Sequence, residues 1–179
     1  TFENVSFAYP GVEQVLKGVG FVVYPGETVA VVGPTGSGKT TLFHLLERFY
    51  EVGEGSIRVD GVDIRDWDLK ALRSQMGLVM QDTFLFSGDI EDNIRLGNAQ
   101  EDQSRVREAA IMVNAGALIQ KLPHGYQTQV GEGGEMISAG EKQLLAFARA
   151  LYLPPRILLL DEATSHVDPE TEALIQEGL

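Results

Sequence analysis

Short stretches of alternating hydrophobic and polar positions open the chain and predict strands joined by turns. Residues 5–9 alternate large and small side chains and stop at Pro10 and Gly11, the pattern of a strand closed by a turn. A second apolar stretch, residues 19–24, ends at another Pro-Gly pair. Residues 57–64 carry an Asp-Gly pair between alternating apolar positions, which predicts a hairpin. These strands together predict an antiparallel β subdomain.

Three almost wholly apolar runs have the composition of strands that are buried on both faces of a parallel sheet. They are residues 28–32, 77–80 and 157–160. The first runs directly into a glycine-rich segment, and the third ends at Asp161 and Glu162. The sequence therefore predicts a parallel core sheet with polar groups at the carboxyl ends of its strands.

Two other segments change the apolar period to that of a helix. The first opens at Lys39, and its apolar positions are Leu42, Leu45, Leu46 and Phe49. The second stops at two prolines, and its apolar positions are Leu144, Phe147, Ala148 and Leu151. Residues from about 91 to 122 are also rich in helix formers, so we interpret the region of about 85–145 as a helical insert within one α/β domain.

Composition and charge narrow the classes of partner. The 179 residues contain 14 Lys and Arg against 26 Asp and Glu, a formal charge of -12, which argues against a nucleic-acid backbone or an anionic lipid surface. No apolar run approaches the roughly 20 residues of a membrane span, so the fragment itself is expected to be soluble. Without cysteine there is no disulfide or thiolate, and the three histidines are too scattered in sequence to suggest a zinc site.

The glycine-rich segment has the spacing of a phosphate-binding loop, Gly-x4-Gly-Lys-Thr. Its residues are Gly33, Pro34, Thr35, Gly36, Ser37, Gly38, Lys39 and Thr40. Glycine freedom lets successive backbone N–H groups turn toward phosphate oxygens at a positive helix N-terminus. Lys39 would bridge the β- and γ-phosphates, and the Thr40 hydroxyl would hold Mg²⁺. The alternative is a glycine turn that binds nothing.

Two further polar sites have both a chemical and a structural interpretation. Asp161 is placed to hold the water shell of Mg²⁺ and Glu162 to orient an attacking water, although both acids would also suit a helix cap. Ser138 and Glu141 match a capping box at the start of the second helix, and with the bare Gly140 the same helix N-terminus would suit an anion. The two interpretations of the second site are compatible.

In their order along the chain, these motifs resemble the nucleotide-binding domain of an ATP-binding-cassette (ABC) transporter, and the resemblance covers residues 1–179. It implies a P-loop NTPase fold, Mg²⁺-dependent ATP hydrolysis, and a partial ABC ATP-binding domain whose cofactors are ATP and Mg²⁺. The catalytic residues that it implies are Glu162, Lys39 and Gln81, and the metal ligands are Thr40, Gln81 and Asp161. Apart from the loop itself, its nucleotide contacts are Tyr9, Thr41, Ser138 and Gly140.

The resemblance also gives each of these residues a role. Tyr9 would stack on adenine, and Gln81 would touch Mg²⁺ or the attacking water; each is otherwise only a polar or aromatic residue at a strand end. Ser138 and Gly140 match the signature motif, which in this family reaches across a head-to-tail dimer to the other subunit's γ-phosphate. Asp168 matches a loop that crosses the same interface.

Two stretches favour an exporter within this family. Residues 81–90 and 130–134 resemble the segments that exporters place against the coupling helices of their transmembrane domains. The implied partners are a second nucleotide-binding domain and the transmembrane domains of the transporter, at the cytoplasmic face of a cell membrane. The alternatives are a soluble ABC ATPase that is not attached to a transporter, and a regulatory nucleotide-binding subunit with little hydrolysis.

The sequence departs from the family pattern in two places. Ile137, Ala139 and Glu141 replace three residues of the usual signature Leu-Ser-Gly-Gly-Gln, which favours one half of a heterodimeric exporter. The family's switch histidine would lie beyond Leu179, and His44, His124 and His166 cannot replace it by position. We therefore expect a domain that is incomplete at its C-terminus and an isolated fragment that hydrolyses ATP poorly.

Overall fold

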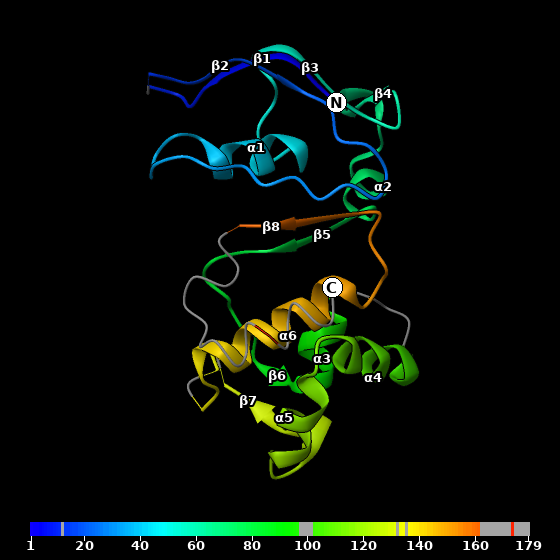
Figure 1. Cartoon of the computed structure of the whole chain (residues 1–179). Helices are drawn as coiled ribbons and strands as arrows, with labels where there is room; N and C mark the ends of the chain where they lie inside the picture. The colour runs from blue at the N-terminus through cyan, green and yellow to red at the C-terminus, as the bar shows by residue number, and fades with distance from the viewer. Residues whose placement is uncertain (12, 97–101, 132, 135, 162–172, 174–179) are drawn as a thin grey trace. The chain divides into compact units, whose positions relative to one another are not determined.

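The computed structural model describes residues 1–11, 13–96, 102–131, 133–134, 136–161 and 173 (Figure 1). The chain forms two compact units, residues 1–75 and residues 76–179, and each is described here by itself. Within the described residues, no helix is long and apolar enough to cross a membrane.

The first unit contains the expected antiparallel sheet. Its strands are β1 (Phe2–Ala8), β2 (Gln14–Phe21), β3 (Glu54–Val59) and β4 (Val62–Asp63), and they lie in the order β2-β1-β3-β4. The β3–β4 hairpin turns at Asp60 and Gly61, whose φ angles of 50° and 79° are those of a type I′ turn. The apolar patterns therefore predicted this subdomain, although β2 begins before the expected stretch 19–24 and ends within it, at Phe21.

The helix after the glycine-rich segment also forms where it was expected. It is α1 (Lys39–Leu46), and it buries Leu42, Leu45 and Leu46. Phe49 was expected on the same face but is 51% exposed, because α1 ends before it. Two short elements complete the unit, η1 (Ile64–Asp66) and α2 (Leu69–Arg73).

One expected strand is absent from the first unit. The segment 28–32 forms no ladder with any strand of its own unit, although its sequence is β-branched and apolar. Val29, Val31 and Val32 are 48%, 40% and 87% exposed. The prediction of a strand buried on both faces was wrong for this unit, because strand propensity supplies no hydrogen-bonding partner.

The second unit contains the expected parallel pair. β5 (Met76–Val79) and β8 (Ile157–Leu160) pair in parallel, with Val79 opposite Leu160. A smaller antiparallel pair joins β6 (Gly88–Asp89) to β7 (Gln129–Val130). The expected strands at 77–80 and 157–160 are thus confirmed to within one residue at each end.

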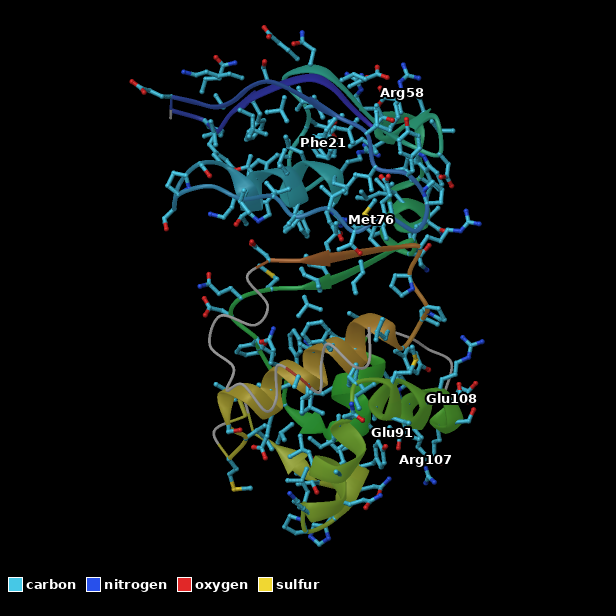
Figure 2. All side chains as sticks on the ribbon, in the orientation of Figure 1. Phe21, Arg58, Met76, Glu91, Arg107 and Glu108 are labelled. Atoms are coloured by element: carbon cyan, nitrogen blue, oxygen red, sulfur yellow. The ribbon has the colours of Figure 1, made fainter. Side chains whose placement is uncertain are left out.

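Helices make up most of the remaining described residues of the second unit, as the helix-former content predicted. They are α3 (Ile90–Arg95), α4 (Gln103–Met112), α5 (Ala115–Lys121), the short η2 (Gly125–Gln127) and α6 (Ala139–Leu151). Phe147 of α6 is fully buried in a hydrophobic core that also draws on α3, α4 and α5. The labelled Glu108 of α4 is exposed and lies at the outer surface of this unit (Figure 2).

Candidate nucleotide-binding site

The glycine-rich segment of the first unit forms a tight loop between β2 and α1. Gly36 and Gly38 have φ angles of 82° and 94°, and the Ser37 N–H donates to the Pro34 carbonyl at 3.1 Å. A Cβ on Gly38 would lie 2.8 Å from a Leu16 methyl of β2. Both the left-handed backbone and the close approach of β2 therefore require glycine at this position.

Lys39 begins α1 and reaches back over the loop. Its Nζ donates to the carbonyls of Gly33 at 3.0 Å and Pro34 at 3.3 Å. No acidic residue lies in the first turn of α1, so no carboxylate competes with an anion at this helix N-terminus. The loop, the ammonium and the helix end together supply the N–H donors and the positive charge that suit a phosphate chain.

A hollow of ≈ 500 Å³ adjoins the loop within the first unit. One side of it consists of loop residues, among them Gly33, Ser37 and Lys39. The rest of its lining is largely apolar and comes from β2, from residues 29–32 and from Leu42. Part of the glycine-rich segment therefore borders open space within this unit.

Tyr9, just beyond the end of β1, is tied to α1 by its hydroxyl. The hydroxyl oxygen lies 3.1 Å from Thr41 Oγ1 and 3.1 Å from His44 Nδ1, both hydrogen-bond distances. Its ring makes edge contacts with Phe7 and Tyr50, with centroids 4.9 Å away in each case. The sequence pointed to Tyr9 and Thr41, but it gave His44 no role at this site.

In the second unit, Gln81 and Asp161 follow two adjacent parallel strands. Gln81 comes just after β5, and Asp161 directly follows β8 and donates its backbone N–H to Val79 at 3.0 Å. Because β5 and β8 are parallel and adjacent, both residues lie at the carboxyl-terminal end of this strand pair. Glu162, the expected catalytic acid, lies outside the described residues, as do His166 and Asp168.

The signature segment forms the expected capping box at the start of α6. Ser138 Oγ accepts from the Glu141 N–H at 3.3 Å, and Glu141 Oε2 accepts from the Ser138 N–H at 2.8 Å. Gly140, the third member of this turn, is buried. The carboxylate of Glu141 therefore accepts a hydrogen bond from the backbone at the start of its own helix.

Replacing Ser138 with alanine is expected to lower the free energy of unfolding by about 1 kcal/mol, because the Glu141 N–H then loses its cap. Glu141→Gln should cost much less, since an amide oxygen still accepts from the Ser138 N–H. Denaturant unfolding of both variants and the wild type measures the difference. Equal destabilisation by the two substitutions would contradict the box.

Gln143 of α6 bonds to the loop that follows β5, a contact that the sequence analysis missed. It is buried, its Oε1 accepts from the Thr83 hydroxyl at 2.6 Å, and its Nε2 donates to the Met80 carbonyl at 3.4 Å. These bonds fasten the loop that carries Gln81 to the first turns of α6, which begin at the signature segment. No local pattern signals such a contact, because its partners are about sixty positions away in sequence.

Two exposed aromatic side chains follow Gln81 on a firmly held loop. Phe84 and Phe86 are 47% and 45% exposed. The loop backbone is held by the buried Asn93, whose amide bonds to both the N–H and the carbonyl of Phe86 at 2.8 Å. Arg149 donates to the Phe84 carbonyl at 3.1 Å, and burial lowers the pKa of this arginine. The rings are thus presented on a fixed backbone.

Comparison with known proteins shows which family the chain belongs to. The family model described as ABC transporter matches residues 16–165. The Bacillus subtilis protein YknV, described as an uncharacterized ABC transporter ATP-binding protein, is 47% identical over 179 residues, which are 100% of this chain and 30% of that protein. A Mycobacterium bovis protein described as a fatty acid ABC transporter ATP-binding/permease protein is 49% identical over 178 residues, 99% of this chain and 28% of that protein.

A solved structure is also closely similar. It is described as a bacterial Atm1-family ABC exporter with ATP bound, and it matches with a TM-score of 0.93 and 44% sequence identity. The match covers 99% of this chain and 31% of that one. This chain therefore spans less than a third of the length of these relatives.

Proposed function

Since the chain belongs to the ABC transporter family, where it corresponds to the nucleotide-binding domain of the exporters, we propose that it binds and hydrolyses ATP to power export of a substrate across a membrane. The phosphate loop of the first unit is the observation that carries this proposal. Gly38, Lys39 and the N-terminus of α1 give that loop the geometry and charge that a triphosphate needs.

Phosphate capture requires only a small rearrangement of Lys39. Its ammonium now bonds to two neutral carbonyls of the loop, and charged phosphate oxygens are stronger acceptors at the same place. Backbone N–H groups of the loop and of the first turn of α1 would bind the remaining oxygens. At the other end of the nucleotide, Tyr9 would stack its ring on the adenine base.

The donor chemistry of Thr40, Gln81 and Asp161 fits Mg²⁺. Hydroxyl, amide and carboxylate oxygens are hard ligands, and this cation keeps several waters and uses few protein groups. In the described part of the chain, no group of three or more acidic or histidine side chains is placed to hold a metal ion. When bound, the ion would neutralise charge on the phosphate oxygens.

Hydrolysis then needs a water that is aligned with the γ-phosphate. Glu162, which follows Asp161 at the end of β8, would orient this water and accept its proton. Gln81 would contact the same water or the ion. The protein acts chiefly by positioning and charge neutralisation rather than by covalent chemistry.

The proposed transporter requires two kinds of partner domain. A second nucleotide-binding domain would pack head to tail, so that Ser138 and Gly140 of one chain meet the nucleotide held by the other. The transmembrane domains, which would keep this chain at the cytoplasmic face of the membrane, would dock on the exposed rings of Phe84 and Phe86. Nothing in the charge of the chain favours nucleic acid, which weakens the soluble alternative.

The altered signature supports a heterodimeric exporter with two unlike sites. Ala139 adds a Cβ where glycine is usual, and Glu141 brings a carboxylate to this helix N-terminus although it caps its own helix, so the site on the partner's loop is expected to differ in occupancy from the one on this chain. Site-resolved nucleotide trapping in the assembled transporter measures both. Equal occupancy and equal hydrolysis at the two sites would rule out the heterodimer.

Phosphate release by the full-length protein in lipid vesicles tests the proposed activity. We expect steady turnover that stops when the divalent cation is chelated. A regulatory subunit would bind ATP without releasing phosphate.

The isolated chain is expected to turn over ATP barely above background, because each composite site takes half of its groups from a partner. Brisk turnover of the isolated chain would contradict that arrangement.

A further inference from the structure

The hydroxyl of Tyr9 makes hydrogen bonds that stacking of its ring on a base does not require. A phenylalanine ring offers the same face to adenine, yet Tyr9 places its hydroxyl between Thr41 and His44, one helical turn apart on α1. Thr41 is buried, while Tyr9 and His44 are half-buried. The ring that is expected to meet the base is thus attached to the helix that carries the phosphate loop.

His44 is itself held in place, as a residue that positions another must be. Its ring lies edge-on to Phe49 with centroids 5.9 Å apart, and tilted against Tyr50 at 6.0 Å. Phe49 in turn lies under the guanidinium of Arg73, 4.8 Å from the ring centroid. Arg73 also donates to the Glu47 carbonyl at 2.9 Å, at the end of α1. The imidazole is therefore packed against two aromatic rings, one of which, Tyr50, also contacts the ring of Tyr9.

We propose that His44 is a positioning residue for base recognition: through its hydrogen bond it fixes the ring of Tyr9 relative to the phosphate loop. This inference rests on the proposed function, in which Tyr9 is the base platform. A ring fixed before the ligand arrives loses less conformational freedom on binding, so the tether raises the affinity for nucleotides that carry a base. It contributes nothing to a ligand that has phosphates alone.

Two ligands and a double-mutant cycle test the tether in the full-length protein. ATP has both a base and a phosphate chain, whereas inorganic tripolyphosphate has only the chain. Loss of one hydrogen bond is expected to weaken ATP binding by about fivefold in His44→Ala, and by at least as much in Tyr9→Phe. Adding His44→Ala to Tyr9→Phe should produce no further loss, since the bond is already gone. Tripolyphosphate affinity should stay unchanged throughout.

Two more variants control for a merely structural effect. His44→Asn places an amide near the position of Nδ1 and should restore most of the ATP affinity. His124→Ala removes an exposed histidine of the second unit, which belongs neither to α1 nor to the glycine-rich segment, and it should behave as the wild type. A general loss of folding in His44→Ala would weaken both ligands alike, and that result would overturn the proposal.

The outcomes also separate this inference from the proposed function. If Tyr9→Ala leaves ATP affinity unchanged, Tyr9 is not the base platform and the inference falls with it. If Tyr9→Ala weakens ATP binding while Tyr9→Phe and His44→Ala do not, the platform stands and only the tether is overturned. Additive losses from the two single substitutions would likewise contradict the tether.

Discussion

Replacing Glu162 with glutamine is expected to lower ATP turnover by about 10²- to 10⁴-fold, because the water loses the group that accepts its proton. ATP binding should be retained, since the amide keeps the size of the carboxylate and the phosphate loop is untouched. Phosphate release and equilibrium ATP binding by the full-length protein, with its partner domain present, measure the two effects separately.

A matched control for this substitution is Glu108→Gln, an exposed acid on α4 of the same unit (Figure 2). It removes the same charge far from β8 in sequence and should leave turnover near that of the wild type. Near-normal hydrolysis by Glu162→Gln would remove Glu162 from the mechanism. An equal loss from Glu108→Gln would mean that net charge, not position, matters.

Lys39→Ala is expected to weaken ATP binding by about 10- to 150-fold, the value of one hydrogen bond between charged groups. The ammonium lies over the loop where the phosphates would bind, and alanine leaves no group in its place. Tripolyphosphate should lose as much affinity as ATP, because the contact involves only phosphate. Equilibrium titration of the full-length protein with both ligands measures the loss.

Lys70→Ala is the corresponding control, since Lys70 is exposed on α2 of the same unit. It removes an equal charge outside the loop, and both affinities should stay close to those of the wild type. Unchanged ATP binding by Lys39→Ala would show that the loop is a glycine turn without a ligand.

Sequence patterns predicted the elements that neighbouring residues determine. The start of α1 at Lys39 follows from the change of period after the loop, and the β3–β4 hairpin follows from its Asp60-Gly61 turn. The capping box of Ser138 and Glu141 was likewise evident from spacing alone. In each case the residues that decide the structure lie within a few positions of one another.

The features that the sequence could not predict depend on distant partners. The segment 28–32 has strand composition but no ladder within its unit, and Phe49 has helical spacing but lies beyond the end of α1. His44 and Gln143 gained their roles from Tyr9 and Thr83, contacts that only the folded chain creates. Composition indicates how a residue packs, not which residue it meets.

Trapping of ADP with orthovanadate tests the central claim, hydrolysis of ATP on this domain, most directly. Vanadate resembles the phosphoryl group in the transition state, so a hydrolytic site holds it with ADP far more tightly than it holds the product alone. We predict that the full-length protein, incubated with ATP, Mg²⁺ and vanadate and then freed of unbound ligand, retains ADP, and that it does not when the cation is chelated. Retention of ATP without any vanadate-dependent retention of ADP would contradict the account and indicate a domain that only binds nucleotide.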